Sequence, residues 1–209
     1  MNQALIKRKT RRNPEASRQI LIDATLDTIA EIGITDATVS RIIERARLSR
    51  GMIHLHFGGK DYLLTSAAEY LSAEYYRQRR EEIADAGNHA PDIILALIQA
   101  NLSEPIMNSR SVKFWHAFRG VSPTLPVIAK YASTQDDELS EILLRAFKQI
   151  SAEYRVNELS VDASGATFGT LALLDGMWVH YLSDMNGFSR EGSFALIRKF
   201  LAGLFPKHF

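Results

Sequence analysis

Apolar residues recur at spacings of three and four along nearly the whole chain, a pattern typical of amphipathic helices. The first such stretch begins near Ser17, and we expect Gly33 to end it in a left-handed conformation. Its apolar face carries Leu21, Ala24, Thr25, Ile29 and Ile32. No stretch of useful length alternates apolar with polar residues. The sequence therefore predicts an all-α chain.

Two short helices, three residues apart, come next. Thr38 is expected to cap a helix over 38–45, because a hydroxyl side chain can accept a hydrogen bond from a free N–H at a helix start. Ser49 is expected to cap a second helix, over 49–56, in the same way. A Gly-Gly pair ends that helix, and a long fourth helix is predicted to begin near Lys60. The two short helices have the proportions of a helix-turn-helix.

The remaining chain reads as further helices separated by Pro and Gly residues, after a break at 87–91. The predicted helices cover 92–101, 112–118, 126–154, 164–185 and 190–204. Three parts follow from this order: an arm over 1–16, a small three-helix unit over 17–62 and a larger helical bundle over 63–209.

Composition narrows the possible classes of protein. The chain of 209 residues contains no cysteine, which excludes disulfides, thiolate metal sites and thiol catalysis. It has no run of about 18 apolar residues that could span a membrane, and its start lacks the apolar core of a signal peptide. We therefore expect a cytoplasmic protein with no metal and no cofactor.

The charge is distributed unevenly although the net charge is only +1. Residues 1–60 contain 11 Lys and Arg against 6 Asp and Glu, whereas residues 61–209 contain 14 against 18. The basic end is where a polyanion would bind. The arm carries Lys7, Arg8, Lys9, Arg11 and Arg12. It could contact phosphates or the minor groove of DNA, or serve only as a solubilising tail.

In a helix-turn-helix the N-terminal half of the second helix faces the base edges of the major groove. Ile53 and Phe57 are four residues apart and are expected to pack inward, which leaves the other side of that helix free. Gly51 would allow the backbone to approach DNA closely. The residues predicted to contact DNA are Thr38, Arg41, Arg47, Ser49, Arg50, Gly51, Met52, His54, Leu55, His56 and Lys60. The alternative is an ordinary helical hairpin within a bundle.

Residues 18–64 closely resemble the N-terminal domain of TetR-family transcriptional repressors. The matching positions, in order, are Ile20, Leu21, Ala24, Gly33, Thr38, Val39, Ile42, Ala46, Leu48, Ser49, Gly51, Ile53, His56, Phe57, Lys60 and Leu63. Two departures are Arg47, where the family usually has glycine in the turn, and His54, where it usually has tyrosine. The resemblance implies that the chain reads operator DNA, with its own sequence preference.

The remainder is similar to the effector domain of the choline-responsive, BetI-like branch of that family. The similar segments are Phe114–Phe118, followed by Pro126, and Leu173–Trp178. The resemblance implies a dimer whose last long helices form a four-helix interface, and a ligand that releases operator DNA by tilting the fourth helix. Choline or betaine aldehyde is the implied effector; an unrelated apolar or aromatic ligand is the alternative.

The spacing of residues along the predicted helices indicates which of them bind the ligand and which form the dimer interface. An aromatic cage can hold a quaternary ammonium, and a carboxylate in an otherwise apolar helix can pair with a cation. The predicted ligand residues are Phe114, Trp115, Phe118, Asp175, Trp178 and Tyr181. A core position for the aromatic residues, and a hydrogen bond to a neighbouring helix for Asp175, are the alternatives. Gly165, Gly169, Ala172 and Gly176 form a small-residue stripe suited to a dimer interface or to close packing within one subunit.

An enzyme and a helical adaptor are the two alternatives to a ligand-responsive repressor. The chain has no GxSxG, HExxH or paired-carboxylate motif, so we expect no enzyme. A helical adaptor acting through residues 92–209 would leave the basic N-terminal unit unexplained. Activation in place of repression stays open.

Overall fold

The computed structural model describes residues 14–121, 126–153 and 162–209, and every regular element in those ranges is helical. This confirms the all-α prediction. None of the described helices is both long and apolar enough to cross a membrane. The predictions for the basic arm fall mainly on residues 1–13, which lie outside the described part of the chain.

The described α-helices follow the predicted order; the last has the predicted bounds, and the others differ from them by a few residues. They are α1 (Pro14–Asp36), α2 (Val39–Ala46), α3 (Gly51–Phe57), α4 (Lys60–Ile83), α5 (Ala90–Leu102), α6 (Ser109–Val121), α7 (Pro126–Ala152), α8 (Ala163–Ser183) and α9 (Arg190–Leu204). A short 3₁₀ turn, η1 (Ala84–Ala86), follows α4. The first helix starts at Pro14 and not at Ser17, because proline is well suited to a first helical turn, where its missing N–H is not needed.

The helix boundaries near the N-terminus have local causes. Gly33 interrupts α1 with φ 80° and ψ 166°, so its φ is positive as expected, but its ψ is extended and not left-handed helical. The Thr38 hydroxyl accepts a hydrogen bond from the Arg41 N–H at 3.4 Å, which confirms the cap of α2. The Ser49 cap is wrong. Helix α3 begins at Gly51, its N-cap residue is Arg50 without a capping side-chain bond, and Ser49 uses its main-chain carbonyl to accept from the Met52 N–H.

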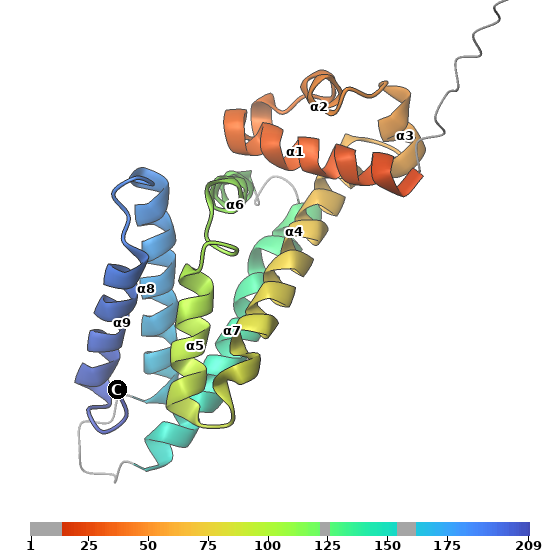
Figure 1. Cartoon of the computed structure of the whole chain (residues 1–209). Coiled ribbons are helices and arrows are strands. Elements are labelled where there is room, and N and C mark those ends of the chain that lie inside the picture. Colours follow the sequence, from red (N-terminus) through yellow and green to blue (C-terminus); the bar gives the residue numbers. More distant parts are fainter. Residues whose placement is uncertain (1–13, 122–125, 154–161) are drawn as a thin grey trace, which may run out of the picture.

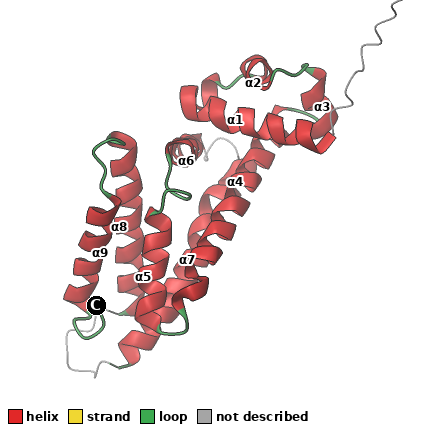
Figure 2. Ribbon diagram, in the orientation of Figure 1, coloured by secondary structure: helices red, strands yellow, loops and turns green. Residues whose placement is uncertain are grey.

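The helices form a small N-terminal unit joined by α4 to an elongated bundle (Figures 1 and 2). One apolar cluster holds the buried faces of α1 to α3 and the first turns of α4 as far as Ala68. A second fills the bundle of α5, α7, α8 and α9. Helix α6 lies at the junction beside α1; its buried residues Phe114, Trp115 and Phe118 belong to the first cluster, and its buried Val112 belongs to the second. The N-terminal unit is thus completed by a helix that comes about 90 residues later.

Candidate functional site

The first candidate site is the outer surface of α2 and α3. Ile42, Ile53 and Phe57 turn inward and are at most 8% exposed. The opposite side of α3 stays uncovered: Arg50, Gly51 and His54 are exposed, and Leu55 is 74% exposed. An apolar side chain so open to water on a seven-residue helix marks a surface that is not committed to the protein's own core.

Packing within the protein does not require glycine at position 51. A Cβ added there would meet nothing within 4 Å, so the absence of a side chain only makes the outer surface flatter. Glycine nevertheless costs helix stability, about 1 kcal/mol relative to alanine. Its position at the exposed start of α3 therefore fits close approach of another molecule to the backbone.

His54 and His56 differ in their surroundings. The Nδ1 atom of His54 lies 3.2 Å from the Gly58 carbonyl oxygen, which can only accept, so Nδ1 carries the hydrogen. The Nε2 atom of His54 is then free of that bond. His56 is half-buried, and its Nε2 is shielded from solvent without a hydrogen-bond partner. His54 is thus placed to meet a base edge, whereas the Nε2 of His56 is not placed to meet a phosphate in this conformation.

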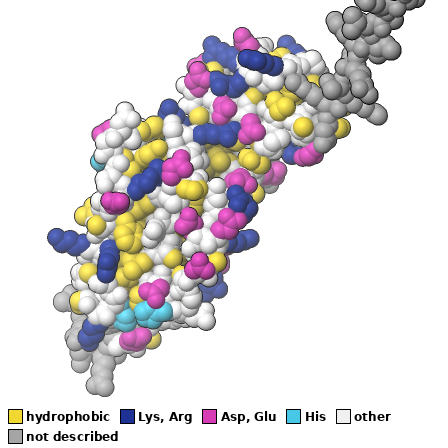
Figure 3. Space-filling model, in the orientation of Figure 1, with side chains coloured by type: hydrophobic (Ala, Val, Ile, Leu, Met, Phe, Trp, Pro, Cys, Tyr) yellow, Lys and Arg dark blue, Asp and Glu magenta, His cyan; other side chains and the backbone are white. Residues whose placement is uncertain are grey.

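The remaining residues predicted to contact DNA surround α3. Thr38, Arg41, Arg47 and Ser49 are exposed, and Met52 and Lys60 are half-buried. Tyr62, in the first turn of α4, is also 70% exposed, although the sequence did not single it out. No periodic signal distinguishes it, because exposure of an aromatic residue depends on how α3 and α4 pack. Lys and Arg side chains are visible around α2 together with acidic ones (Figure 3).

The second candidate site is a partly open cavity of about 470 Å³ in the C-terminal bundle, with exposed residues of α8 at its rim. It is lined by residues of α4 to α8: Tyr75, Asn101, Trp115, Arg119, Leu139, Phe168, Leu171, Ala172, Leu174, Asp175 and Trp178. Most of these side chains are apolar or aromatic. The polar ones are largely engaged: the Tyr75 hydroxyl donates to Asn101 Oδ1 at 2.7 Å, and Asn101 Nδ2 donates to the Leu97 carbonyl at 2.8 Å. Such a chamber suits a small, mainly apolar molecule.

The charges at the cavity come as a pair. Arg119 Nη1 donates to Asp175 Oδ1 at 3.1 Å, between α6 and α8. Asp175 is exposed and bonded to a neighbouring helix, which is the alternative considered from sequence. Nearby, burial lowers the pKa of His116 below its ordinary value, and the Arg119 charge lowers it further, whereas Asp175 acts in the opposite direction. A cation entering the cavity would have to share Asp175 with Arg119.

Three of the six predicted ligand residues, Trp115, Asp175 and Trp178, line this cavity. Phe114 and Phe118 do not. Both are 0% exposed and stack on each other at 4.1 Å between ring centroids, in the cluster shared with α1. Tyr181 also lies elsewhere: its ring packs edge-on against Phe188 at 5.3 Å. The core alternative therefore describes Phe114 and Phe118, whereas Tyr181 is half-buried and packs against the second apolar cluster. Sequence reasoning missed Tyr75, Asn101 and Arg119, which are brought to the cavity only by the packing of α4, α5 and α6.

The small-residue stripe on α8 has two environments. Gly165, Ala172 and Gly176 are exposed. Gly169 is half-buried, and a Cβ added there would lie 3.1 Å from Phe200 Cζ on α9, so this position serves packing within the subunit. Large apolar side chains accompany the stripe: Phe168, Val179, Leu196 and Phe200 are between 36% and 75% exposed. Hydrophobic side chains accordingly gather over α8 and α9 in Figure 3.

Comparison with known proteins gives consistent matches over both units. Residues 21–67 match the family described as "Bacterial regulatory proteins, tetR family", and residues 90–206 match "BetI-type transcriptional repressor, C-terminal". The HTH-type transcriptional regulator BetI of Stenotrophomonas maltophilia is 32% identical over 162 residues, covering 78% of this chain and 79% of that protein. BetI 1 of Chromohalobacter salexigens is 33% identical over 166 residues, covering 78% and 77%.

Solved structures share the fold. A transcriptional regulator of Pseudomonas aeruginosa PAO1 superposes with a TM-score of 0.81 at 26% identity, over 99% of this chain and 97% of that one. A regulator of Saccharomonospora viridis, crystallised in complex with choline, gives a TM-score of 0.76 over 90% and 96%. At 18% identity that second likeness concerns the fold alone.

Proposed function

The chain belongs to the BetI-type branch of the TetR family of transcriptional regulators, and from that premise we propose that it represses transcription as a dimer which a small organic cation releases from its operator. The observation that carries the proposal is the uncovered side of α3, whose inner side is fixed to the core by Ile53 and Phe57. Such a regulator acts in the cytoplasm, where its DNA lies.

In the complex, α3 enters the major groove of the operator. Arg50 suits the two acceptors of a guanine, and His54 offers Nε2 to a base edge. Leu55 supplies an apolar contact of the kind that thymine methyl groups attract. Phosphate contacts come from the exposed residues around α3: Thr38, Arg41, Arg47 and Ser49, with Lys60 at the start of α4.

The dimer forms through α8 and α9. Their exposed apolar residues would otherwise remain in water, and the exposed glycines beside them let two helices approach closely. Two copies of this helix pair make a four-helix interface. The symmetry presents two α3 helices to two half-sites of the operator.

The effector occupies the cavity next to Asp175. Trp115 and Trp178 provide aromatic faces, each worth about 0.5–2 kcal/mol to a well-placed cation. Asp175 supplies the negative charge once the cation shares it with Arg119. Choline is the effector we propose, and the choline complex of a protein with the same fold supports it. The mainly apolar lining favours a second candidate, an uncharged apolar or aromatic ligand.

DNA binding is tested by fluorescence anisotropy with the DNA upstream of the gene. The double variant Arg50→Ala/His54→Ala should bind this DNA at least about 30-fold more weakly, because it loses two base contacts worth about 1–3 kcal/mol each. The control is Lys148→Ala, which removes one positive charge from an exposed position of α7. Unchanged binding in the double variant would remove α3 as the reading element.

The effector is tested by calorimetry with choline and with 3,3-dimethyl-1-butanol, the neutral molecule of the same shape. Choline should bind and the neutral molecule should bind at least about tenfold more weakly, because it lacks the charge that Asp175 and the indole faces attract. Asp175→Asn should weaken choline binding, whereas Asp184→Asn, at the end of the same helix, should not. Equal binding of both compounds would favour the apolar ligand.

A further inference from the structure

Helix α6 connects the effector domain to the DNA-binding unit through its aromatic residues. Phe114 and Phe118 are fully buried in the apolar cluster of α1, with Trp115 at 5.3 Å from Phe114 between ring centroids. The reading helices are fixed to α1 in turn: Ile42 of α2 and Ile53 of α3 lie in the same cluster. A displacement of α6 therefore acts on α1, and α1 carries α2 and α3 with it.

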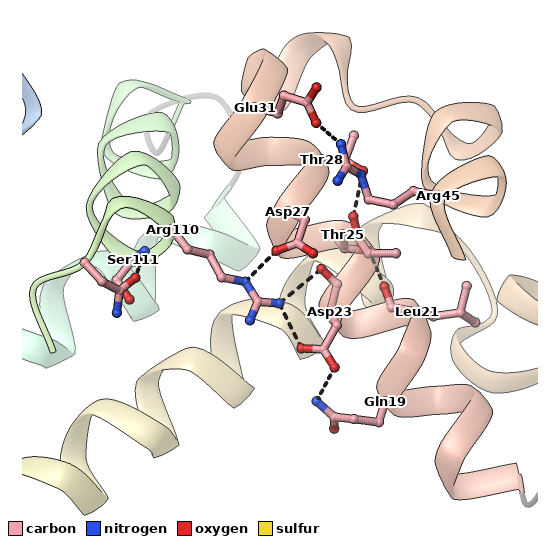
Figure 4. Close-up of polar contacts among 12 residues, drawn as sticks. Gln19, Leu21, Asp23, Thr25, Asp27, Thr28, Glu31, Arg45, Arg110 and Ser111 are labelled. Carbon is pink, nitrogen blue, oxygen red and sulfur yellow. Dashed lines mark hydrogen bonds and ion pairs between the residues drawn. The ribbon is translucent and has the colours of Figure 1, made fainter. Parts of the chain in front are cut away.

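An ion cluster reinforces this contact at one end of α6 (Figure 4). Arg110 Nη2 lies 2.8 Å from Asp23 Oδ1 and 3.1 Å from the Asp23 carbonyl oxygen, and Arg110 Nε lies 2.9 Å from Asp27 Oδ1. Asp23 and Asp27 are one helical turn apart on α1, so they face the same side. The planar guanidinium can bridge both carboxylates at once, which the single ammonium of a lysine does less well.

Arg110 also lies next to the wall of the effector cavity. A smaller cavity of about 140 Å³ is lined by Arg110 together with Tyr75, Trp115 and Trp178, and these three aromatic side chains also line the 470 Å³ cavity. The two hollows therefore share one aromatic wall. Protein interiors are close-packed, so a side chain can shift only where empty space lies behind it. The smaller cavity gives Trp115 that space, on the side where Arg110 binds α1.

We propose that Arg110, through Asp23 and Asp27, strengthens the coupling of the effector cavity to the DNA-binding unit that the aromatic residues of α6 provide. A ligand in the large cavity pushes the aromatic wall toward the small one, α6 shifts, and Arg110 draws α1 and the reading helices with it. Arg110 is a positioning residue in this scheme and touches neither ligand nor DNA. The inference rests on the proposed function, since it assumes that the large cavity holds the effector.

The test compares Arg110→Met with Arg77→Met. Arg77 is a matched control, because it also binds two carboxylates, Glu74 at 2.9 Å and Glu81 at 2.8 Å, but both lie on its own helix α4. The Arg110 guanidinium and both of its partners are more than a third exposed, so the loss of this cluster costs little stability and the variant should fold.

The first measurement is the operator dissociation constant with and without saturating choline. In the wild type and in Arg77→Met, the dissociation constant with choline divided by that without choline should be roughly 5–150, the usual range of coupling between two sites. Arg110→Met should bind choline within about threefold of the wild type, yet its ratio should be about two- to fivefold smaller than that of the wild type; Arg110→Lys should restore part of this loss. A wild-type ratio in Arg110→Met would overturn the proposal.

The second measurement needs no operator release. The chain has no native cysteine, so Ser40→Cys on α2 allows one spin label per subunit and reports the distance between the two reading units of a dimer. Choline should shift this distance in the wild type and shift it less in Arg110→Met. Without any ligand, Arg110→Met should broaden the distance distribution and Arg77→Met should not.

The two measurements distinguish a wrong effector from a wrong role of Arg110. If choline shifts nothing in the wild type, the proposed effector is wrong, and the ligand-free distributions still decide the role of Arg110. Distributions of equal width in Arg110→Met and Arg77→Met would then overturn the coupling proposal. A choline-induced shift in Arg110→Met as large as that in the wild type would do the same while leaving the proposed effector intact.

Discussion

Arg47 ends α2 in a conformation that costs free energy. Its φ of 52° and ψ of 42° are left-handed, and it is the non-glycine residue with positive φ in the described part of the chain. The turn is held by two hydrogen bonds, from Arg47 N–H to the Glu44 carbonyl and from Leu48 N–H to the Ile43 carbonyl, each 3.2 Å. These are the two bonds of a Schellman turn, in which glycine is the usual residue at this position.

The change Arg47→Gly should therefore stabilise the protein. The left-handed conformation costs an L-residue roughly 1–2 kcal/mol, which glycine avoids because it has no Cβ. Glycine in turn loses about 0.4–1 kcal/mol more conformational entropy on folding. The net gain is about 0.5–1 kcal/mol in the free energy of unfolding. For a chain of this length that raises Tm by roughly 1–4 °C.

Calorimetric or circular-dichroism melting measures the change, with Arg47→Ala as the control. Alanine removes the same guanidinium but keeps the Cβ, so it should not raise Tm. Both variants should lose the proposed phosphate contact in each subunit of the dimer, and the slope of log K against log salt should fall in magnitude by about 1.8. An equal rise of Tm in Arg47→Ala and Arg47→Gly would refute the explanation by backbone strain.

Three further changes test other parts of the account. Phe118→Ala should lower the free energy of unfolding by about 3–5 kcal/mol in chemical denaturation, because it removes a fully buried ring stacked on Phe114; a loss below about 1 kcal/mol would contradict its core role. Leu196→Glu should yield monomers in sedimentation, since it places a charge on the exposed apolar surface of α9, and an intact dimer would exclude that surface as the interface. Because the pKa of His116 is lowered by burial, the unfolded chain binds a proton more readily, so stability should fall as pH drops from about 7 to 5, and His116→Gln should remove that part of the loss. Identical pH profiles of the wild type and His116→Gln would contradict this assignment.

The local features of the fold could be predicted from the sequence. Helical periodicity and the Gly and Pro breaks located the helices within a few residues, and the Thr38 cap followed from a rule that involves only residues 38 to 41. The failure at Ser49 shows the limit of that rule. A hydroxyl before a helical pattern marks a start only when the backbone turns there, and α3 begins two residues later.

The long-range features could not be predicted in this way. Phe114 and Phe118 are four residues apart, and that spacing is the same whether a helix faces a ligand cavity or another helix. Only the packing of α6 on α1 assigns them to the core. The contact between Arg110 and Asp23 spans 87 residues, and the contact between Arg119 and Asp175 spans 56, so no local pattern indicates either pair.

Operator binding under control of a ligand is the central claim, and one titration tests it most directly. Labelled DNA from upstream of the gene and a scrambled duplex are titrated with the protein at one salt concentration, with and without choline. The account predicts binding to the upstream DNA at least about 10³-fold tighter than to the scrambled duplex, and a loss of about 5–150-fold when choline is added. Equal affinity for the two duplexes, unchanged by choline, would contradict it.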